Sequence, residues 1–492
     1  MIRIYNTLSG QKEEFRPISD DAVRMYACGV TVYDHSHIGH ARGAVVFDVV
    51  VSYLRHRGYK VKYARNFTDV DDKIIKRAAE TDMTWQAVAE KYTQEYIKDM
   101  DALGVGRPDV EPKATEHIPE IIDLVKRIVG NGYGYESGGD VFFSVRKFKG
   151  YGKLSGKSLD DMVAGSRVDV DERKEDPMDF VLWKSSKPGE PSWDSPWGPG
   201  RPGWHIECSA MSFKHLGETF DIHGGGMDLQ FPHHENEIAQ AEAATGKPFV
   251  RYWMHNGFVN VNREKMSKSL GNFFTIKEIL AKYEPEAIRL FLLSTHYRNP
   301  IDFSDQSLKD ARAALDRYYS MVEALTEALG DHKGGAYDAG KLTGVARKLH
   351  KATDAFRSKF YEAMDDDFNT AGALGAVYEM VREVNRVTVD KVLTDADRSL
   401  KDVLSASRDA LSEASGILNL FQKTPADWFN RQAAGADASG MPSDDEIKAL
   451  IEERKQARAG KNWKRADEIR DILDAKGIEL LDGAEGTKWR LK

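Results

Sequence analysis

The N-terminal part of the chain carries the pattern that most restricts its fold. A short apolar run, Val23–Cys28, precedes a loop, and the apolar residues of Ile38–Arg57 then recur at helical spacing until Gly58. Tyr59–Phe67 alternates as a strand does. A strand, a helix and a strand in this order form a right-handed parallel unit. The sequence therefore predicts an α/β fold with a Rossmann-type parallel sheet.

The rest of the chain is expected to form further domains, because 492 residues exceed what one hydrophobic core usually organises. A stretch rich in Gly, Pro and Trp interrupts the α/β pattern, which resumes near Trp204, and helical spacing dominates after Ser307. Two helices, Asp444–Ala459 and Trp463–Lys476, and a hairpin are predicted at the end of the chain. The predicted parts are a catalytic domain over 1–112 and 203–306, an insertion domain over 113–202, an α-helical bundle over 307–423, a linker over 424–443 and a small mixed α/β domain over 444–492.

Composition and charge narrow the class of protein. Hydrophobic residues make up 41% and charged residues 30%, as in a soluble globular protein. No signal peptide is visible at the start, and the most apolar run, Gly43–Leu54, is too short to span a bilayer. We expect a cytoplasmic protein without membrane contact. The net charge of −8 does not suggest a nucleic-acid binder, but Lys448–Lys492 holds 12 Lys and Arg against 9 Asp and Glu.

His37-Ile38-Gly39-His40 lies between the first predicted strand and helix. Helix N-termini offer free N–H groups and a partial positive charge, which phosphates favour. Gly39 leaves space for a flat adenine near the backbone, and His37 and His40 can donate hydrogen bonds as charge develops on phosphate oxygens. The structural alternative is a pair of histidines that cap the helix.

Lys265-Met266-Ser267-Lys268-Ser269 is the second candidate motif. Two lysines and two serines in a loop can clamp an anion such as a leaving pyrophosphate. An exposed basic loop is the alternative for this motif taken alone. In this order and on these elements, the two motifs resemble the HIGH and KMSKS signatures of class I aminoacyl-tRNA synthetases.

The chain has only two cysteines, Cys28 and Cys208. A disulfide and two buried free thiols are both open, and a shared metal is the sharper hypothesis. His233 and Glu237 are spaced to share one helix face, after Pro232 in a first helical turn. Two thiolates, an imidazole and a carboxylate would suit zinc, whereas an ordinary helix-surface pair is the alternative for the last two.

Several segments are similar to cysteinyl-tRNA synthetases, and the likeness extends over essentially the whole chain. They are Cys28–Asp34, Asn66–Lys73, Trp204–Met211, His223–Leu229, Phe231–Glu237 and Met364–Thr370. The resemblance implies one zinc ion per subunit on Cys28, Cys208, His233 and Glu237, where it would select cysteine over serine by binding the substrate sulfur. It also implies ATP, with Mg2+, L-cysteine and tRNA(Cys) as partners, and we expect a monomer.

The resemblance also distributes roles among single residues. Phosphates would be contacted by His37, His40, Lys265 and Lys268. The nucleotide site would be lined by Gly29, Thr31, Gly39, Gly225 and Asp228, although Asp228 is equally suited to a helix N-cap. The cysteine pocket would be walled by Thr68, Trp204 and His223, although Trp204 is also suited to a core. Anticodon bases would be met by Arg458, Trp463, Asp467 and Asp482, with a solvated charged face and a packed Trp463 as the alternative.

Two other functions remain open at this point. A ligase of the same catalytic family that joins cysteine to an amino-sugar acceptor would share the first half of the chain but lack the C-terminal domain. A non-catalytic tRNA-binding paralogue would have lost the phosphate-binding residues, whereas His37, His40 and Lys268 are present here.

Overall fold

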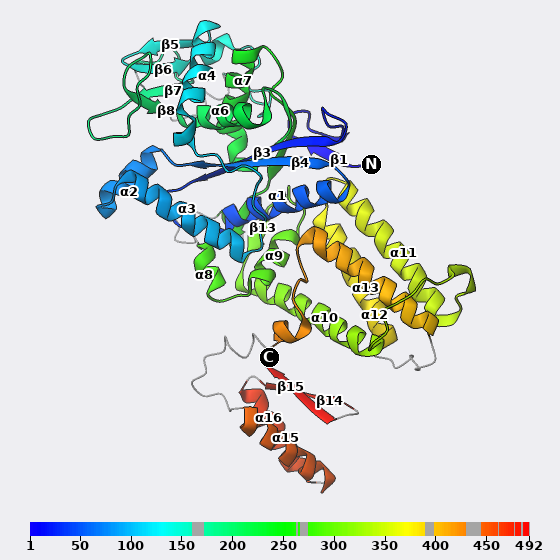
Figure 1. Ribbon diagram of the computed structural model, residues 1–492. Coiled ribbons are helices and arrows are strands. Elements are labelled where there is room, and N and C mark those ends of the chain that lie inside the picture. The colour runs from blue at the N-terminus through cyan, green and yellow to red at the C-terminus, as the bar shows by residue number, and fades with distance from the viewer. Residues whose placement is uncertain are drawn as a thin grey trace.

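The computed structural model places a parallel sheet between an insertion domain on one side and a helical bundle on the other (Figure 1). The residues that it describes are 1–159, 172–261, 264–265, 274–388, 398–429, 444–460, 462–476, 478–483 and 486–491. A short antiparallel hairpin opens the chain, with β1 at Arg3–Asn6 and β2 at Gln11–Glu14.

The central sheet has four strands, in the order β10-β9-β3-β4, and all of its pairings are parallel. The strands are β3 (Ala22–Thr31), β4 (Lys60–Thr68), β9 (Phe220–Gly226) and β10 (Val250–Asn256). Helix α1, Ile38–His56, connects β3 to β4. The predicted strand–helix–strand unit and the Rossmann-type class are confirmed, and Gly58 takes a φ of +91° where the helix has ended.

Helices cover both faces of this sheet, because alternate strand residues point to opposite sides. Met25 packs in the core that includes α1 and α3, whereas its neighbour Tyr26 packs in the core that includes α6 and α7. The helices are α2 (Asp72–Thr81), α3 (Trp85–Ala102), α6 (Trp204–Leu216) and α7 (Glu235–Thr245). The result is a three-layer arrangement in which both faces of the sheet are buried.

A second, small sheet follows the central one, with β11 between β12 and β13. Its strands are β11 (Val259–Val261), β12 (Glu264–Lys265) and β13 (Ile301–Phe303). Helices α8 (Ile276–Leu280) and α9 (Pro285–Leu293) lie between β12 and β13 in the chain. Single turns of 3-10 or π-helix are found at Ala114–His117, Val145–Lys147, Met227–Leu229, Gln230–His234 and Ala339–Lys341.

The insertion forms an antiparallel sheet in the order β5-β6-β7-β8, packed against α4. Its elements are α4 (Ile118–Gly130), β5 (Gly134–Ser137), β6 (Asp140–Phe143), β7 (Phe180–Ser185) and β8 (Gly200–Pro202). Trp183 is fully buried in this core, beside Phe143 and Leu182. The insertion core also reaches Ile206 of α6, which joins it to the central sheet.

Among the described residues, four long helices form the bundle, in agreement with the predicted helical period. They are α10 (Asp305–Leu329), α11 (Gly344–Asp365), α12 (Thr370–Thr388) and α13 (Arg398–Leu418). The buried carboxylate of Asp367, in the turn between α11 and α12, accepts hydrogen bonds from Tyr5 N (2.8 Å), Tyr297 Oη (2.8 Å) and Arg298 Nε (2.7 Å). This carboxylate therefore attaches the bundle to β1 and to the segment before β13.

The C-terminal part consists of α15 (Asp444–Ala459), α16 (Trp463–Ala475) and a hairpin of β14 (Ile478–Gly483) and β15 (Gly486–Leu491). Ile447, Ile469, Leu473 and Ile478 form its own small core. The predicted linker differs from the structure at its start, because residues 425–429 are helical. Trp428 is buried there, stacks on Tyr319 of α10 and donates to Asp316 at 2.8 Å.

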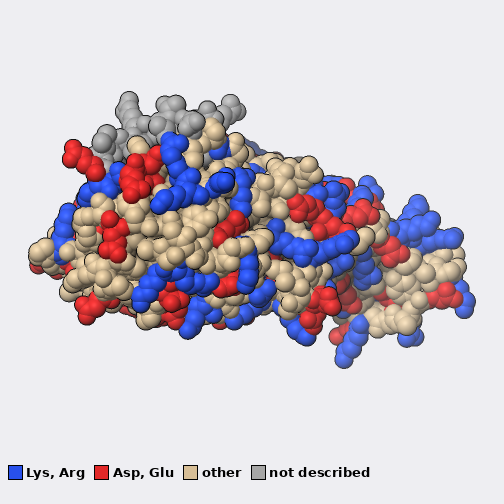
Figure 2. Space-filling view, turned by 90° about the horizontal axis from the view of Figure 1, so that it is seen from above, with Lys and Arg blue, Asp and Glu red and all other residues tan. Residues whose placement is uncertain are grey.

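Lys and Arg are mixed with Asp and Glu over the face seen in Figure 2, so neither sign dominates it. Within the described residues, no helix combines the length and the apolar composition needed to cross a bilayer.

Candidate functional site

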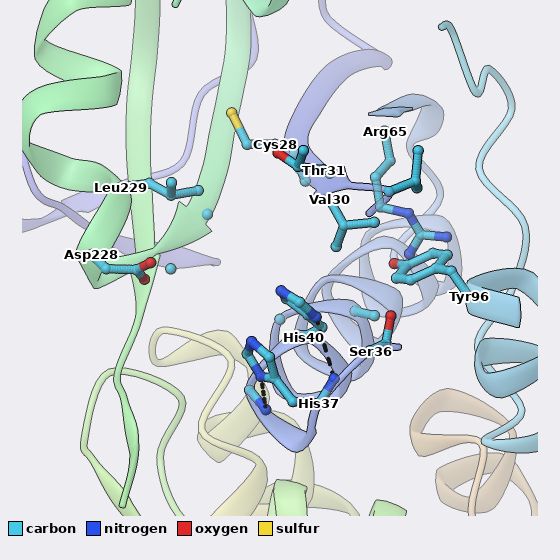
Figure 3. Close-up of a pocket in the computed structure, with 18 of the residues that line it drawn as sticks. Cys28, Val30, Thr31, Ser36, His37, His40, Arg65, Tyr96, Asp228 and Leu229 are labelled. Atoms are coloured by element: carbon cyan, nitrogen blue, oxygen red, sulfur yellow. Dashed lines mark hydrogen bonds between the residues drawn. The ribbon is translucent and has the colours of Figure 1, made fainter. Parts of the chain in front are cut away.

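A cavity of about 480 Å³ opens where β3 and β9 end and α1 begins, the edge at which parallel sheets bind ligands. Many of the predicted site residues line it, namely Cys28, Gly29, Thr31, His37, Gly39, His40, Trp204, Gly225 and Asp228. Figure 3 shows the rings of His37 and His40 on one wall, Cys28 and Thr31 across from them and Asp228 to one side. The last residue of β10, Asn256, and the loop residues Gly257 and Phe258 also line the cavity, and no sequence pattern singled them out.

His37 and His40 cap α1 and also form part of the cavity wall. His37 Nδ1 accepts a hydrogen bond from Gly39 N (3.1 Å), and His40 Nδ1 accepts one from His37 N (3.4 Å). The two rings stack with centroids 3.6 Å apart. The capping interpretation and the phosphate-binding interpretation are therefore compatible, since the cap fixes both rings at the helix N-terminus beside the cavity.

Two of the predicted glycines are enforced by close packing. A Cβ on Gly29 would lie 1.7 Å from the carbonyl oxygen of Asn66, and Gly29 N donates to Asn66 Oδ1 at 2.9 Å. A Cβ on Gly225 would lie 2.6 Å from Cε1 of His234. Neighbouring protein atoms leave no room for a side chain at either position. Both residues must therefore be glycine, and only their backbone atoms line the cavity.

Asp228 lies in the 3-10 turn Met227–Leu229, whose N-cap position is occupied by Gly226. The N-cap alternative for Asp228 is therefore wrong. The side chain is exposed and reaches the cavity from the end of β9 (Figure 3).

The four proposed metal ligands come together behind the cavity, although they lie far apart in the sequence. Cys28 Sγ is 3.7 Å from Cys208 Sγ and 3.4 Å from Glu237 Oε1, and His233 Nε2 is 3.0 Å from Glu237 Oε1. Bond lengths of about 2.0–2.3 Å in a tetrahedral zinc site place ligand atoms roughly 3.3–3.8 Å apart. The donor types and their separations thus fit zinc. The thiols are free, so a disulfide is wrong.

Each of these ligands is held by a different part of the fold. Cys28 lies in β3, Cys208 on α6, His233 in the turn before α7 and Glu237 in the first turn of α7. Pro232 belongs to that preceding turn, and not to the first turn of the helix as predicted. The last three ligands are buried, whereas Cys28 lines the cavity and so connects the cluster to it.

The electrostatics of the cluster favour ionised acidic groups beside a protonated imidazole. A hydrogen bond from Cys28 lowers the pKa of the Cys208 thiol to about 6. Burial opposes ionisation of Glu237, but the imidazoles of His223 and His233 hold the pKa of its carboxyl group well below the ordinary value. Burial also opposes protonation of His233, yet the Glu237 carboxylate raises the pKa of that imidazole to about 10. A thiolate, a carboxylate and an imidazolium are therefore gathered in a buried space, and a metal ion bound there would replace the proton on His233.

Two further histidines that no sequence pattern singled out are His234, among the converging donors, and His205, in contact with His233. His234 Nε2 is 3.3 Å from Cys28 Sγ, and Cys28, His223, His234 and Glu237 form a second group of converging donors. His205 lies behind His233, with their Nδ1 atoms 2.9 Å apart, and burial lowers the pKa of His205 well below its ordinary value. A neutral imidazole in this place fixes the orientation of the His233 ring.

The three residues proposed for the cysteine pocket occupy different positions. Trp204 is 38% exposed, lines the cavity and stacks on His233 with centroids 4.3 Å apart, so the core alternative is wrong. His223 is fully buried, and its Nε2 is 3.0 Å from Glu237 Oε2. Thr68 is buried and donates to Glu207 Oε2 at 2.9 Å. Only Trp204 of the three lines the cavity itself.

The lysine motif is described only at its first residue. The backbone of Lys265 lies in β12, where it pairs with Asn260 of β11. Lys268 lies outside the described residues.

The residues proposed to meet the anticodon lie in the C-terminal part. Trp463 is 60% exposed at the start of α16, so the alternative of a packed tryptophan is wrong. Arg458 on α15 and Asp467 on α16 are also exposed. Asp482 is placed in β14 by its backbone.

Sequence comparison finds similar proteins over the full length. Residues 14–313 match the family described as the class I (C) tRNA synthetase catalytic domain, and residues 359–422 match the DALR domain. The cysteine–tRNA ligase of Geobacter sulfurreducens is 55% identical over 491 residues, and that of Geobacter metallireducens is 56% identical over 492 residues. Each alignment covers 100% of both chains.

Comparison of the fold finds two more distant synthetases. Methionyl-tRNA synthetase of Mycobacterium tuberculosis, solved in complex with methionyl-adenylate, has a TM-score of 0.64 at 16% identity, covering 85% of this chain and 96% of that one. A putative arginyl-tRNA synthetase of Campylobacter jejuni has a TM-score of 0.55 at 14% identity, covering 82% and 93%. At these identities the likeness concerns the fold alone.

Proposed function

Because the chain belongs to the cysteine–tRNA ligase family of class I aminoacyl-tRNA synthetases, we propose that its cavity activates L-cysteine with ATP and charges tRNA(Cys). One observation carries this proposal most directly. A buried cluster of two thiols, an imidazole and a carboxylate lies behind a cavity lined by the two histidines that cap α1. The cluster and the cavity share Cys28, so an amino acid bound to the first would face a nucleotide in the second.

The reaction has two steps. The cysteine carboxylate attacks the α-phosphorus of ATP, which forms cysteinyl-adenylate and releases pyrophosphate. A ribose hydroxyl at the 3′ end of the tRNA then attacks the carbonyl carbon of the adenylate and releases AMP. Neither step needs a covalent bond to the protein, so catalysis depends on positioning and on stabilisation of developing charge.

The residues of the cavity would share this work. His37 and His40 would donate to phosphate oxygens from the α1 N-terminus, with Lys265 and Lys268 acting on the pyrophosphate. Gly29, Thr31, Gly39 and Gly225 would line the nucleotide site through their backbone atoms, and Asp228 would accept a hydrogen bond from a ribose hydroxyl. Mg2+ would accompany ATP and neutralise its phosphates.

The cluster would hold zinc through Cys28, Cys208, His233 and Glu237. When bound, zinc would supply a soft Lewis acid that favours a thiolate over an alcohol, and so distinguishes cysteine from serine. Shape alone would distinguish these two substrates poorly, because they differ by a single atom. Trp204 stacks on His233 and would close the pocket over the side chain, with Thr68 and His223 behind it.

Treating the purified protein with a strong chelator is expected to release about one zinc ion per chain and to abolish cysteine-dependent ATP–pyrophosphate exchange. Added zinc should restore exchange, whereas serine should support little exchange in either state. Metal analysis and isotope exchange would measure both. Full exchange in zinc-free protein would contradict the assigned role of the cluster, and no exchange in zinc-loaded protein would contradict the proposed function.

The C-terminal domain would read the anticodon, since the exposed Trp463 offers a stacking surface between basic groups. The curated relatives match the whole chain, including this domain, which disfavours the amino-sugar ligase. We also propose that the protein is a cytoplasmic monomer.

Replacing Trp463 by alanine is expected to raise the KM for tRNA about tenfold, because stacking contributes about 1–3 kcal/mol per base. Cysteine-dependent pyrophosphate exchange without tRNA should not change. Ile472→Ala provides a matched control, since this side chain is also exposed on α16 but is neither aromatic nor basic. Equal KM values for both variants would place the anticodon contacts elsewhere.

A further inference from the structure

Arg42 is a fully buried arginine on α1, two residues after His40 and outside the lining of the cavity. None of the Asp and Glu side chains that the structure describes lies within ion-pair distance of its guanidinium. A buried charge is costly unless other groups compensate it. The groups that the guanidinium binds must therefore stabilise this buried charge.

The guanidinium is surrounded by backbone carbonyl groups from two separate segments. Nη1 donates to the carbonyl oxygen of Phe258 at 2.8 Å, and Nη2 donates to those of Tyr297 at 3.2 Å and His296 at 3.4 Å, with Asn299 also accepting. Burial lowers the pKa of Arg42 to about 10, so the group remains charged at neutral pH. Carbonyl dipoles thus replace a counter-ion.

The first of these segments leads to the lysine motif. Gly257 and Phe258 line the cavity and precede β11, and β11 pairs with β12 so that Asn260 lies opposite Lys265. The carbonyl group of Phe258 is therefore connected to Lys265 through the short β11–β12 pair alone. A change at Phe258 would be transmitted directly to β12.

The second segment precedes β13, which pairs with β11 in parallel. Gly257 N donates to the carbonyl oxygen of Tyr297 at 2.8 Å, and a Cβ on Gly257 would lie 2.6 Å from the carbonyl carbon of Asn299. The two segments therefore cross in close contact at the point where Arg42 binds both.

We propose that Arg42 is a positioning residue that fixes the N-terminus of α1, with its two histidines, relative to the strand pair that carries Lys265. This inference rests on the proposed function, in which both motifs act on the same nucleotide. Transfer of the adenylyl group depends on such placement, and a change far from the reacting atoms that shifts them by about 1 Å can cost about 100-fold in rate.

Arg42→Met tests this assignment, because methionine keeps much of the length and removes all of the donors. The kcat of pyrophosphate exchange is expected to fall about 100-fold, with the KM values for ATP and cysteine within about threefold and the zinc content unchanged. Arg42→Lys keeps the positive charge but has fewer hydrogen-bond donors, so its kcat should lie between those of Arg42→Met and the wild type. The amplitude of the adenylate burst counts active sites, which separates a slower site from a smaller folded fraction.

Arg289→Met is the matched control. Arg289 is also buried and donates to carbonyl groups, those of Leu418 (3.0 Å), Gly104 (3.3 Å) and Leu103 (3.4 Å). Unlike Arg42 it also pairs with a carboxylate, that of Asp48 in the middle of α1 (2.5 Å), and it contacts neither motif. Its loss should lower stability and leave kcat per active site near that of the wild type. An unchanged kcat per site in Arg42→Met, or an equal loss in Arg289→Met, would overturn the proposal.

Arg42→Lys decides the question if Arg42→Met does not fold. A wild-type kcat per site in the lysine variant would overturn the proposal, and a loss of about tenfold would support it. Absence of exchange in the wild-type protein would instead refute the proposed function, and with it the premise of this inference.

Discussion

Replacing Cys208 by serine is expected to remove zinc and to raise the KM for cysteine by about 100-fold or more. Residues that only support metal ligands already cost about 10–100-fold when they are changed, and Cys208 is proposed to bind the metal itself. Discrimination against serine should fall to what pocket shape provides, about 10–200-fold. The KM for ATP should change little, because the nucleotide is proposed to lie on the other side of Cys28.

Three measurements would check this result, namely zinc per chain, pyrophosphate exchange with cysteine and exchange with serine. Met211→Leu is a matched control, since Met211 is buried on the same helix α6 and offers no charged donor atom. Normal zinc content and normal KM for cysteine in Cys208→Ser would show that another set of donors is used. The second group of converging side chains, with His223 and His234, would then be the next candidate.

Replacing His40 by asparagine is expected to lower the kcat of adenylate formation by about 10²–10³-fold. That is the usual cost of removing one donor to charge that develops in a transition state. His40 also caps α1, and loss of a cap costs about 1 kcal/mol of stability. Because about 1 kcal/mol changes the folding equilibrium constant about fivefold, the loss of rate is expected to exceed the effect on folding by one to two orders of magnitude.

A single-turnover measurement of adenylate formation, with thermal unfolding of the same samples, would separate these effects. His56→Asn is a suitable control because His56 lies in the last turn of the same helix, at the end remote from the cavity. A variant of His40 that lost only stability would leave capping as the sole role of this side chain.

Local pattern was sufficient to predict much of the fold. The spacing of apolar residues in Ile38–Arg57 identified α1, and the runs on either side identified β3 and β4. The two C-terminal helices and the hairpin also follow from pattern, since apolar residues such as Ile469 and Leu473 recur with helical spacing. In each case the buried face of the element is encoded in the segment itself.

Other features depend on contacts between distant parts of the chain. Trp428 belongs to a stretch of linker-like composition, and its burial against Tyr319 is a tertiary contact that no local pattern shows. His234 was missed because it follows His233 directly, and consecutive residues of a regular helix do not face the same way. The irregular turn at Gln230–His234 brings both inward.

The zinc ligands themselves were proposed from a resemblance, and the residues alone left that site open. A signal was nevertheless present in the region that contains His205, His223, His233 and His234. With His215, five of the chain's 14 histidines lie between residues 205 and 234, the stretch that also contains one of its two cysteines. Spacing could not reveal that Cys28 and Cys208 would meet, because 180 residues separate them.

The dispersal of the four donors over β3, α6, the turn before α7 and α7 itself has a thermodynamic corollary. A chain without its assembled sheet possesses no such site, so any ion held there binds the native state alone. Mass action then shifts the unfolding equilibrium by about 2.7 kcal/mol at a hundredfold excess of free metal over its dissociation constant. A shortage of the metal would therefore lower the fraction of folded protein as well as the selectivity of that protein for its amino acid.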